Sequence, residues 1–342
     1  MKIFYFCPSV NIPTGGIKVI YRHVELLKQC GFDAFVLHFE DGFRCDWFQN
    51  STLISYPSPK LINRILFRKK QKYSRSWPTK LVLPDSSLYT IGTDDIIVIP
   101  EVCWMEFKTY WPGIKKVIFN QNGYYTFRYH SLDAQDLLGT YITKDTIACL
   151  SISEDTTKNV HFAFPKLPIY RVKLSIDPSL FHYQNNKKLM VSYMPRKNLY
   201  DIIHVINLLK YHGGIENCQI VPIEEKSEKQ VSEILQNSLI FLSFGYPEGF
   251  SLPPAEAMAC GCLVVGYHGQ AAKEFMRPEF SFPFEIWDSI GIATKTLELI
   301  NTFHKNKFES IRRKASEFIL LNYSLEEEKN ILIKAWSQII TL

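Results

Sequence analysis

The pattern of apolar and polar positions divides the 342-residue chain into strand-length and helix-length segments that alternate. Short apolar runs are typical of buried strands, whereas apolar positions three or four residues apart predict helices. Strands are predicted in the first half over 2–6, 34–37, 96–99, 116–119, 146–150 and 168–172, and in the second half over 189–193, 219–223, 239–244 and 263–265. Helices are predicted over 17–30, 199–211, 289–303, 309–320 and 325–340.

This alternation predicts an α/β protein with parallel sheets. A chain of this length suits two domains that each bury a core of their own. A polar stretch from His182 to Lys188 forms a natural linker between two halves that both begin with a strand, a loop and a helix. The predicted Rossmann-like α/β domains therefore cover 1–181 and 182–324, and a helical segment, 325–342, follows them.

In parallel sheets, the loops at the carboxyl ends of the strands line the ligand crevice. Gly15 and Gly16 stand where the first strand gives way to a helix, so the backbone there can approach a diphosphate closely. Taken alone, such a glycine pair is more often a simple turn. The end of the 219–223 strand, at Ile223, could present backbone groups to the edge of a nucleotide base.

The segment from Phe244 to Cys262 carries the most specific pattern. An apolar strand leads into a turn, Ser251 is placed to cap the following helix, two prolines suit the first helical turn, and Gly261 can end the helix. The N-terminus of such a helix favours an anion.

Two carboxylates bracket this element. Glu248 lies in the loop, and Glu256 is expected in the first helical turn, with seven residues between them, so both can face one crevice. Singly, Glu256 could merely complement the helix dipole and Glu248 could be a solvated turn residue. The combination with the prolines and the short helix favours a ligand site.

The sequence from Glu248 to Glu256 resembles the Glu-x₇-Glu signature of the retaining, family-4-type glycosyltransferases of GT-B fold. The resemblance implies two Rossmann-like domains facing each other across a cleft, an N-terminal domain that binds the acceptor and a C-terminal domain that binds the nucleotide sugar. The last helix is implied to cross back to the N-terminal domain. It also implies that Glu256 accepts hydrogen bonds from ribose hydroxyls and that Glu248 lies beside the transferred sugar. The backbone that approaches the sugar and diphosphate is implied to be that of Gly249, Phe250, Ser251 and Leu252.

Arg196 and Lys197 follow the first strand of the second half and could neutralise a departing diphosphate. An Asp-x-Asp triplet, which commonly holds Mg²⁺ in sugar transferases, is absent from the sequence. Eight scattered cysteines and nine dispersed histidines form no metal motif. We therefore expect no metal and no cofactor, with a nucleotide-sugar donor and a glycan, lipid-linked or other hydroxyl acceptor as substrates.

Two positions depart from the family pattern. Asn122 stands where many relatives have a histidine that touches the transferred sugar, although its amide can still bond a sugar hydroxyl. Ala271 and Ala272 stand near a place where paired glycines are common. These departures leave open a catalytically silent sugar-nucleotide-binding or partner subunit on the same fold. A dinucleotide enzyme is disfavoured, because neither opening loop contains Gly-x-Gly-x-x-Gly.

One segment of the chain is rich in basic residues. The net charge is +5, and eight basic residues but no acidic one lie between Lys60 and Lys80. This segment could contact an anionic membrane surface or an acidic acceptor, or be a solvated helix packed on the core. No nucleic-acid-binding module is recognisable. The expected location is the cytoplasm, where this segment could place the protein at the inner face of a membrane. The base, the sugar, the acceptor and the oligomeric state stay open.

Overall fold

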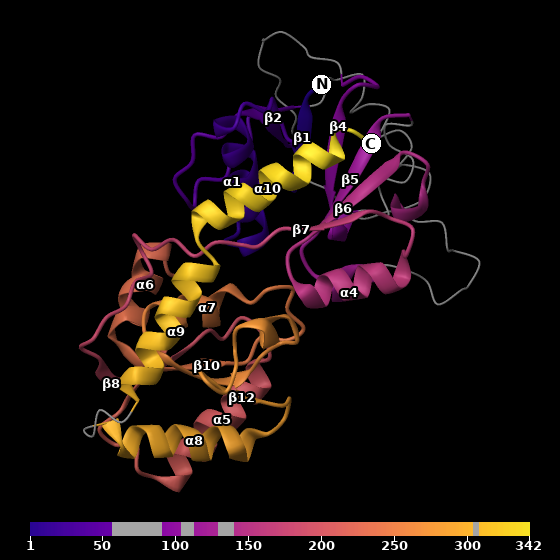
Figure 1. Cartoon of the computed structure of the whole chain (residues 1–342). Coiled ribbons are helices and arrows are strands. Elements are labelled where there is room, and N and C mark those ends of the chain that lie inside the picture. The colour runs from indigo at the N-terminus through magenta and orange to yellow at the C-terminus, as the bar shows by residue number, and fades with distance from the viewer. Residues whose placement is uncertain (57–90, 104–112, 129–139, 304–307) are drawn as a thin grey trace. The chain divides into compact units, whose positions relative to one another are not determined.

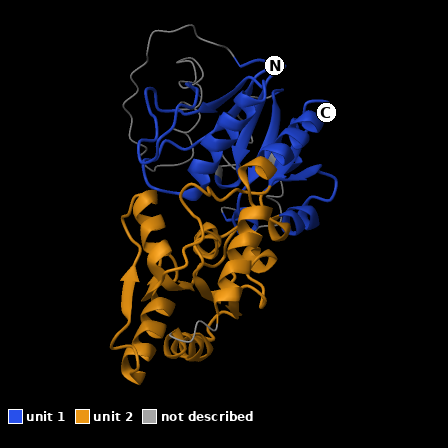
Figure 2. Cartoon of the chain, turned by 60° about the vertical axis from the view of Figure 1, so that its left-hand side comes forward, with its two compact units in different colours: residues 1–151, 157–172, 329–342 blue, residues 152–156, 173–328 orange. Residues whose placement is uncertain are grey.

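The computed structural model describes residues 1–56, 91–103, 113–128, 140–303 and 308–342. The chain forms two compact units (Figure 2). Unit 1 comprises residues 1–151, 157–172 and 329–342, and unit 2 comprises residues 152–156 and 173–328. The boundaries expected from the sequence, after residues 181 and 324, lie nine residues after the division at 172 and four residues before the division at 328. The basic segment 60–80 lies outside the described residues.

Unit 1 is built on a parallel sheet with the strand order β3-β2-β1-β4-β5-β6-β7. The chain starts at β1 in the sheet, builds outward to β3 and then returns to the other side of β1 with β4, so the order reverses between β1 and β4. Both of these strands are completely buried. The strands are β1 (Ile3–Phe6), β2 (Ala34–Leu37), β3 (Ile54–Ser55), β4 (Ile96–Pro100), β5 (Lys115–Asn120), β6 (Thr146–Ser151) and β7 (Ile169–Arg171).

In the part of unit 1 that the structure describes, the α-helices are α1 (Gly15–Gln29), most of α4 (Glu154–Ala163) and most of α10 (Leu325–Ile339). In α10, the fully buried Trp336 donates a hydrogen bond from its indole nitrogen to the hydroxyl of Tyr5 at 2.9 Å. The C-terminal helix is therefore anchored to the first strand of the chain (Figure 1).

Unit 2 contains a second parallel sheet, with the order β12-β11-β10-β8-β9. Its strands are β8 (Lys188–Tyr193), β9 (Gln219–Pro222), β10 (Ser238–Ser243), β11 (Leu263–Tyr267) and β12 (Phe282–Phe284). The helices α5 (Leu199–His212) and α8 (Ser289–Asn301) pack together on one face, and α6 (Glu228–Asn237), α7 (Leu252–Ala259) and α9 (Glu309–Asn322) cover the other (Figure 1).

Two parallel-sheet α/β units confirm the predicted fold class. The elements β3, α4, α6 and β12 are not predicted by the apolar pattern. β12 is a Phe-Pro-Phe segment of three residues, too short to give a pattern. The predicted linker is held in place, because the Arg312 guanidinium donates to the carbonyls of Gln184 and Asn185 at 2.8 and 3.0 Å. Within the described ranges, none of the helices combines the length and apolar character needed to span a bilayer.

Candidate functional site

The candidate site lies at the carboxyl edge of the unit 2 sheet. The chain passes from β8 to β9 on one side and then returns to place β10 on the other side of β8. The strand order therefore reverses between β8 and β10, and a ligand site is expected outside the carboxyl ends of parallel strands at such a switch point. The loops that follow β8 and β10 carry Lys197 and Glu248 respectively.

The structure brings these two side chains together. Lys197 Nζ lies 2.9 Å from Glu248 Oε1, and their side chains are 25% and 17% exposed. Lys197 also donates to the carbonyl of Pro247 at 3.2 Å. The neighbouring Asn198 donates from its side-chain amide to the carbonyls of Phe244 and Tyr246 at 2.6 and 3.2 Å. The ammonium group of Lys197 and the side-chain amide of Asn198 therefore join the two loops through non-covalent bonds.

The loop that carries Glu248 is also fixed against the loop after β11. The Glu248 amide donates to the carbonyl of Gly269 at 3.1 Å. A β-carbon on Gly269 would lie 2.4 Å from the carbonyl oxygen of Gly245, and one on Gly266 would lie 2.2 Å from that of Ser243. Both glycines have positive φ. The backbones approach so closely that only glycine fits at these two positions.

Helix α7 begins at Leu252, with Ser251 in the N-cap position at a φ of +75° and without a side-chain capping bond. The expected capping role of the Ser251 side chain is therefore wrong, although its position is right. Pro253 and Pro254 carry no N–H, so the backbone donors at this end come from Leu252 and the loop before it. Gly261, with φ +79°, ends the helix as predicted.

Glu256 is the fifth residue of α7, so its expected place in the first helical turn is wrong. The helix starts one residue after Ser251, and the prolines fill its second and third positions. Glu256 is half-buried. Phe250 is buried against the rings of Phe275 and Tyr323, with centroids 5.3 and 5.2 Å away. This aromatic cluster holds the start of α7 in place.

The other residues expected in the second half take up different environments. Gly249 is buried and leads into Phe250. Arg196 is exposed beside Lys197. The backbone amide of Ile223 donates to the carbonyl of Tyr193 at 2.7 Å, so this buried residue extends the pairing of β9 with β8.

The residues expected in the first half lie at the carboxyl edge of the unit 1 sheet. Gly15 and Gly16 form the start of α1. A β-carbon on Gly16 would lie 3.1 Å from Oε1 of Gln121, so the loop after β5 closes over this turn. The buried Asn122 accepts the Tyr124 amide on its side-chain oxygen at 3.1 Å and thereby caps the short helix η2 (Gly123–Tyr125).

His268 is not among the predicted site residues. It follows β11 and lies in the loop packed against Glu248. His268 Nδ1 accepts the Gln270 amide at 3.1 Å, which places the proton of the neutral ring on Nε2, 3.7 Å from Glu285 Oε1. Burial and then the charge of Lys273 lower the pKa of His268. The position of His268 in the loop after a predicted strand is the sequence feature that could have pointed to it. No group of three or more His, Cys, Asp and Glu side chains in the described part of the chain could hold a metal ion.

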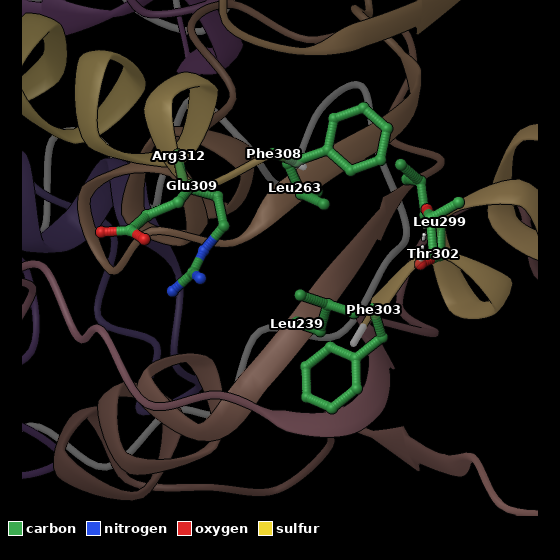
Figure 3. Close-up of a pocket in the computed structure, with 8 residues that line it drawn as sticks. All are labelled: Leu239, Leu263, Leu299, Thr302, Phe303, Phe308, Glu309 and Arg312. Carbon is green, nitrogen blue, oxygen red and sulfur yellow. Dashed lines mark hydrogen bonds between the residues drawn. The ribbon is translucent and has the colours of Figure 1, made fainter. Parts of the chain in front are cut away.

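A small cavity lies elsewhere in unit 2. Its volume is about 20 Å³, enough for a single water molecule. Leu239 and Leu263, near the starts of β10 and β11, line it together with residues of α8 and α9 (Figure 3). It therefore lies at the amino-terminal edge of the sheet, opposite the candidate site, and is too small for a nucleotide.

Comparison with known proteins points to the same region. Residues 195–298, which include Lys197, Glu248 and Glu256, match the family described as glycosyl transferases group 1. A curated relative, the alpha-1,6-glucosyltransferase of Actinobacillus pleuropneumoniae serotype 7, is 24% identical over 277 residues, covering 78% of this chain and 72% of the relative.

Solved structures of low sequence identity share the fold. Sucrose-phosphate synthase from Thermosynechococcus elongatus has a TM-score of 0.69 at 11% identity, with 99% of each chain covered. HepE of Anabaena, solved in complex with UDP-glucose, has a TM-score of 0.66 at 12% identity, covering 99% of this chain and 100% of that one. The chain therefore has the GT-B fold. With the family match over 195–298, these findings support a glycosyltransferase.

Proposed function

We propose that the chain is a retaining glycosyltransferase that moves a hexose-type sugar from a nucleoside diphosphate to a hydroxyl of a glycan or lipid-linked acceptor, without a metal ion. The observation that carries the proposal is the Lys197–Glu248 pair, 2.9 Å apart at the switch point of the unit 2 sheet and inside the segment that matches the glycosyl transferases group 1 family.

The proposed chemistry begins at the diphosphate. As the bond from the sugar's anomeric carbon to the phosphate oxygen breaks, negative charge builds on the leaving group and must be stabilised. Arg196 and Lys197 supply two cations at the end of β8, and the N-terminus of α7 adds backbone donors. These groups would do the work that Mg²⁺ does in enzymes with an Asp-x-Asp triplet, which this sequence lacks.

Glu248 would orient the transferred sugar, and Glu256, one helical turn into α7, would accept hydrogen bonds from the ribose hydroxyls. In unit 1, donor contacts by Asn122 and by the Gly15–Gly16 turn stay predictions from the sequence. The acceptor oxygen would bond to the anomeric carbon on the face that the phosphate leaves. Its proton would pass to the departing phosphate oxygen, which balances the charge and needs no side-chain base.

UDP-glucose is the first donor to test. HepE is solved with UDP-glucose, and the curated relative is an alpha-1,6-glucosyltransferase, so an α-1,6-linked glucose oligosaccharide is the matching first acceptor. A cytoplasmic location and membrane contact through 60–80 stay predictions.

The test is release of UDP from UDP-glucose with and without isomaltotriose. We expect acceptor-dependent release by the native protein and a loss of about 100-fold in Lys197→Ala. Lys226→Ala, which removes an exposed lysine from the loop before α6, should match the native protein. The same substrates with and without EDTA test metal independence, and the anomeric configuration of the product tests retention. Equal rates in the two lysine variants would remove Lys197 from the site.

The second candidate, a silent sugar-nucleotide-binding subunit, is favoured by the use of the Asn122 side-chain oxygen as a local cap. It predicts that UDP-glucose binds but that no acceptor in a panel of glucosides and oligosaccharides promotes UDP release.

A further inference from the structure

Glu101 is a buried carboxyl group that the proposed reaction does not use. It directly follows β4, next to the place where the strand order of unit 1 reverses, and is 4% exposed. Burial raises the pKa of Glu101 to about 7, and a hydrogen bond from the Gln121 backbone opposes this shift. Buried ionisable groups are costly, and those at the carboxyl edge of a sheet are often functional.

The contacts of this carboxyl group extend to both parts of unit 1 that were predicted to bind ligand: the loop that carries Asn122 and the Gly15–Gly16 turn. Glu101 Oε2 accepts the Gln121 backbone N–H at 2.9 Å. The side chain of Gln121 in turn lies over Gly16, where a β-carbon would be 3.1 Å from its Oε1. One carboxyl group therefore fixes the loop after β5, and that loop covers the glycine start of α1.

A second set of bonds holds the same loop from its other side. The Asn120 side chain donates to Thr126 Oγ1 and the Tyr141 hydroxyl at 2.7 and 2.8 Å and accepts the Asn122 amide at 3.1 Å. Among the described residues, the ionisable groups that face Glu101 are Tyr141 and Cys149. Burial raises the pKa of both, so both are neutral at pH 7. Glu101 is then the group of this set that changes charge near neutrality.

We propose that Glu101 is a positioning residue that holds Gln121 and Asn122 against the Gly16 turn and so shapes the acceptor side of unit 1. An ionised carboxylate accepts the Gln121 N–H more strongly than a neutral acid, so the loop is held more firmly as Glu101 loses its proton. The positioning role rests on the hydrogen bond from the Gln121 amide to Glu101 and on the close approach of Gln121 to Gly16. The kinetic consequence rests on the proposed function.

The test compares the native protein with Glu101→Gln and Glu101→Ala, with Glu40→Gln as a control that neutralises an exposed carboxylate in unit 1. Amide hydrogen exchange at Gln121 reports the contact without any activity. Exchange in Glu101→Ala should be about tenfold faster, the cost of a lost bond to a charged group. In Glu101→Gln the Gln121 amide should stay protected, but its protection factor, which corrects for the intrinsic rise of exchange with pH, should not change between pH 6 and 8. Equal protection in all variants would overturn the proposal.

The kinetic readout is the KM for the acceptor between pH 6 and 8.5, measured with isomaltotriose. The native value should fall as pH rises through about 7, and the Glu101→Gln value should stay flat. Affinity for UDP should change less than this KM, because the cations proposed to hold the diphosphate, Arg196 and Lys197, lie in unit 2. A pH dependence retained in Glu101→Gln contradicts the positioning role while leaving the proposed function intact. Absence of transfer by the native protein, with the exchange pattern as expected, contradicts only the proposed function.

Discussion

The ammonium group of Lys197 lies 2.9 Å from Glu248 Oε1 and donates to the carbonyl of Pro247, so its charge is held by partners within unit 2. A bound diphosphate would compete with Glu248 for this cation. If it displaced Glu248, the carboxylate would become available to the sugar as the lysine turned to the phosphate. Donor binding and orientation of the sugar are then coupled through one ion pair.

This coupling predicts opposite effects of Glu248→Gln on binding and on transfer. Loss of the negative charge frees Lys197, so the affinity for UDP should be unchanged or higher. Sugar transfer should fall by about 100-fold, because the group that orients the sugar is weakened. Calorimetric titration with UDP and a UDP-release assay measure the two effects. A parallel loss of affinity and rate would instead assign Glu248 to nucleotide binding.

Glu101 predicts a pH dependence of stability. Its raised pKa, about 7, means that the folded state favours the protonated acid, so its stabilising contribution is lost as pH rises from about 4.5 through 7. Glu101→Gln cannot ionise and escapes this loss. Its free energy of unfolding, relative to the native protein, should rise by up to about 3 kcal/mol between pH 4.5 and 8. Urea unfolding at several pH values measures this, and a constant difference would contradict it.

Gly266→Ala should be severely destabilising. The new β-carbon would meet the carbonyl oxygen of Ser243 at 2.2 Å, in the central pairing of β10 with β11, at a φ of +125°. We expect a loss of at least about 4 kcal/mol in the free energy of unfolding.

Gly31→Ala is the matched control. Its φ of +85° is also positive and unfavourable for alanine, but nothing lies within 4 Å of the added carbon. Its cost should be about 1–2 kcal/mol, from backbone strain alone. Similar losses in the two variants would show that steric contact at Gly266 is not decisive.

The anchoring of α10 can be tested with a double-mutant cycle between Trp336 and Tyr5. Trp336→Phe and Tyr5→Phe each remove one partner of the buried 2.9 Å hydrogen bond. The coupling free energy should be about 1 kcal/mol, the usual net value of such a bond. Additive effects would mean that the bond contributes nothing to holding the helix on unit 1.

Much of this fold could be predicted from the sequence, because buried parallel strands are continuous apolar runs. β2 was predicted residue for residue, and the predicted ends of β8 and α5 lie within one residue of the observed ones. α6 was missed because its sequence is mostly polar, although its capping box, Ser227 with Gln230, was a readable start signal. α4 carries only a weak apolar stripe for the same reason.

The sequence predicted where the candidate site lies, but not which of its residues contact one another. Strand ends placed Lys197 and Glu248 at one edge, yet the sequence could not show that they pair or that Pro247 shares the lysine. Such contacts depend on the strand order, which reverses between β8 and β10 and is set by long-range pairing. Glu101 and His268 were missed for a related reason, since burial of a single polar residue leaves no periodic signal.

The most direct test of the account is the dissociation constant of UDP for the native protein, Lys197→Ala and Lys226→Ala, measured by calorimetry at one salt concentration. The account predicts that Lys197→Ala weakens binding about 10- to 100-fold, the cost of a lost charge-assisted contact, while Lys226→Ala binds like the native protein. Equal affinity in all three proteins, or no binding of UDP by the native protein, would contradict it.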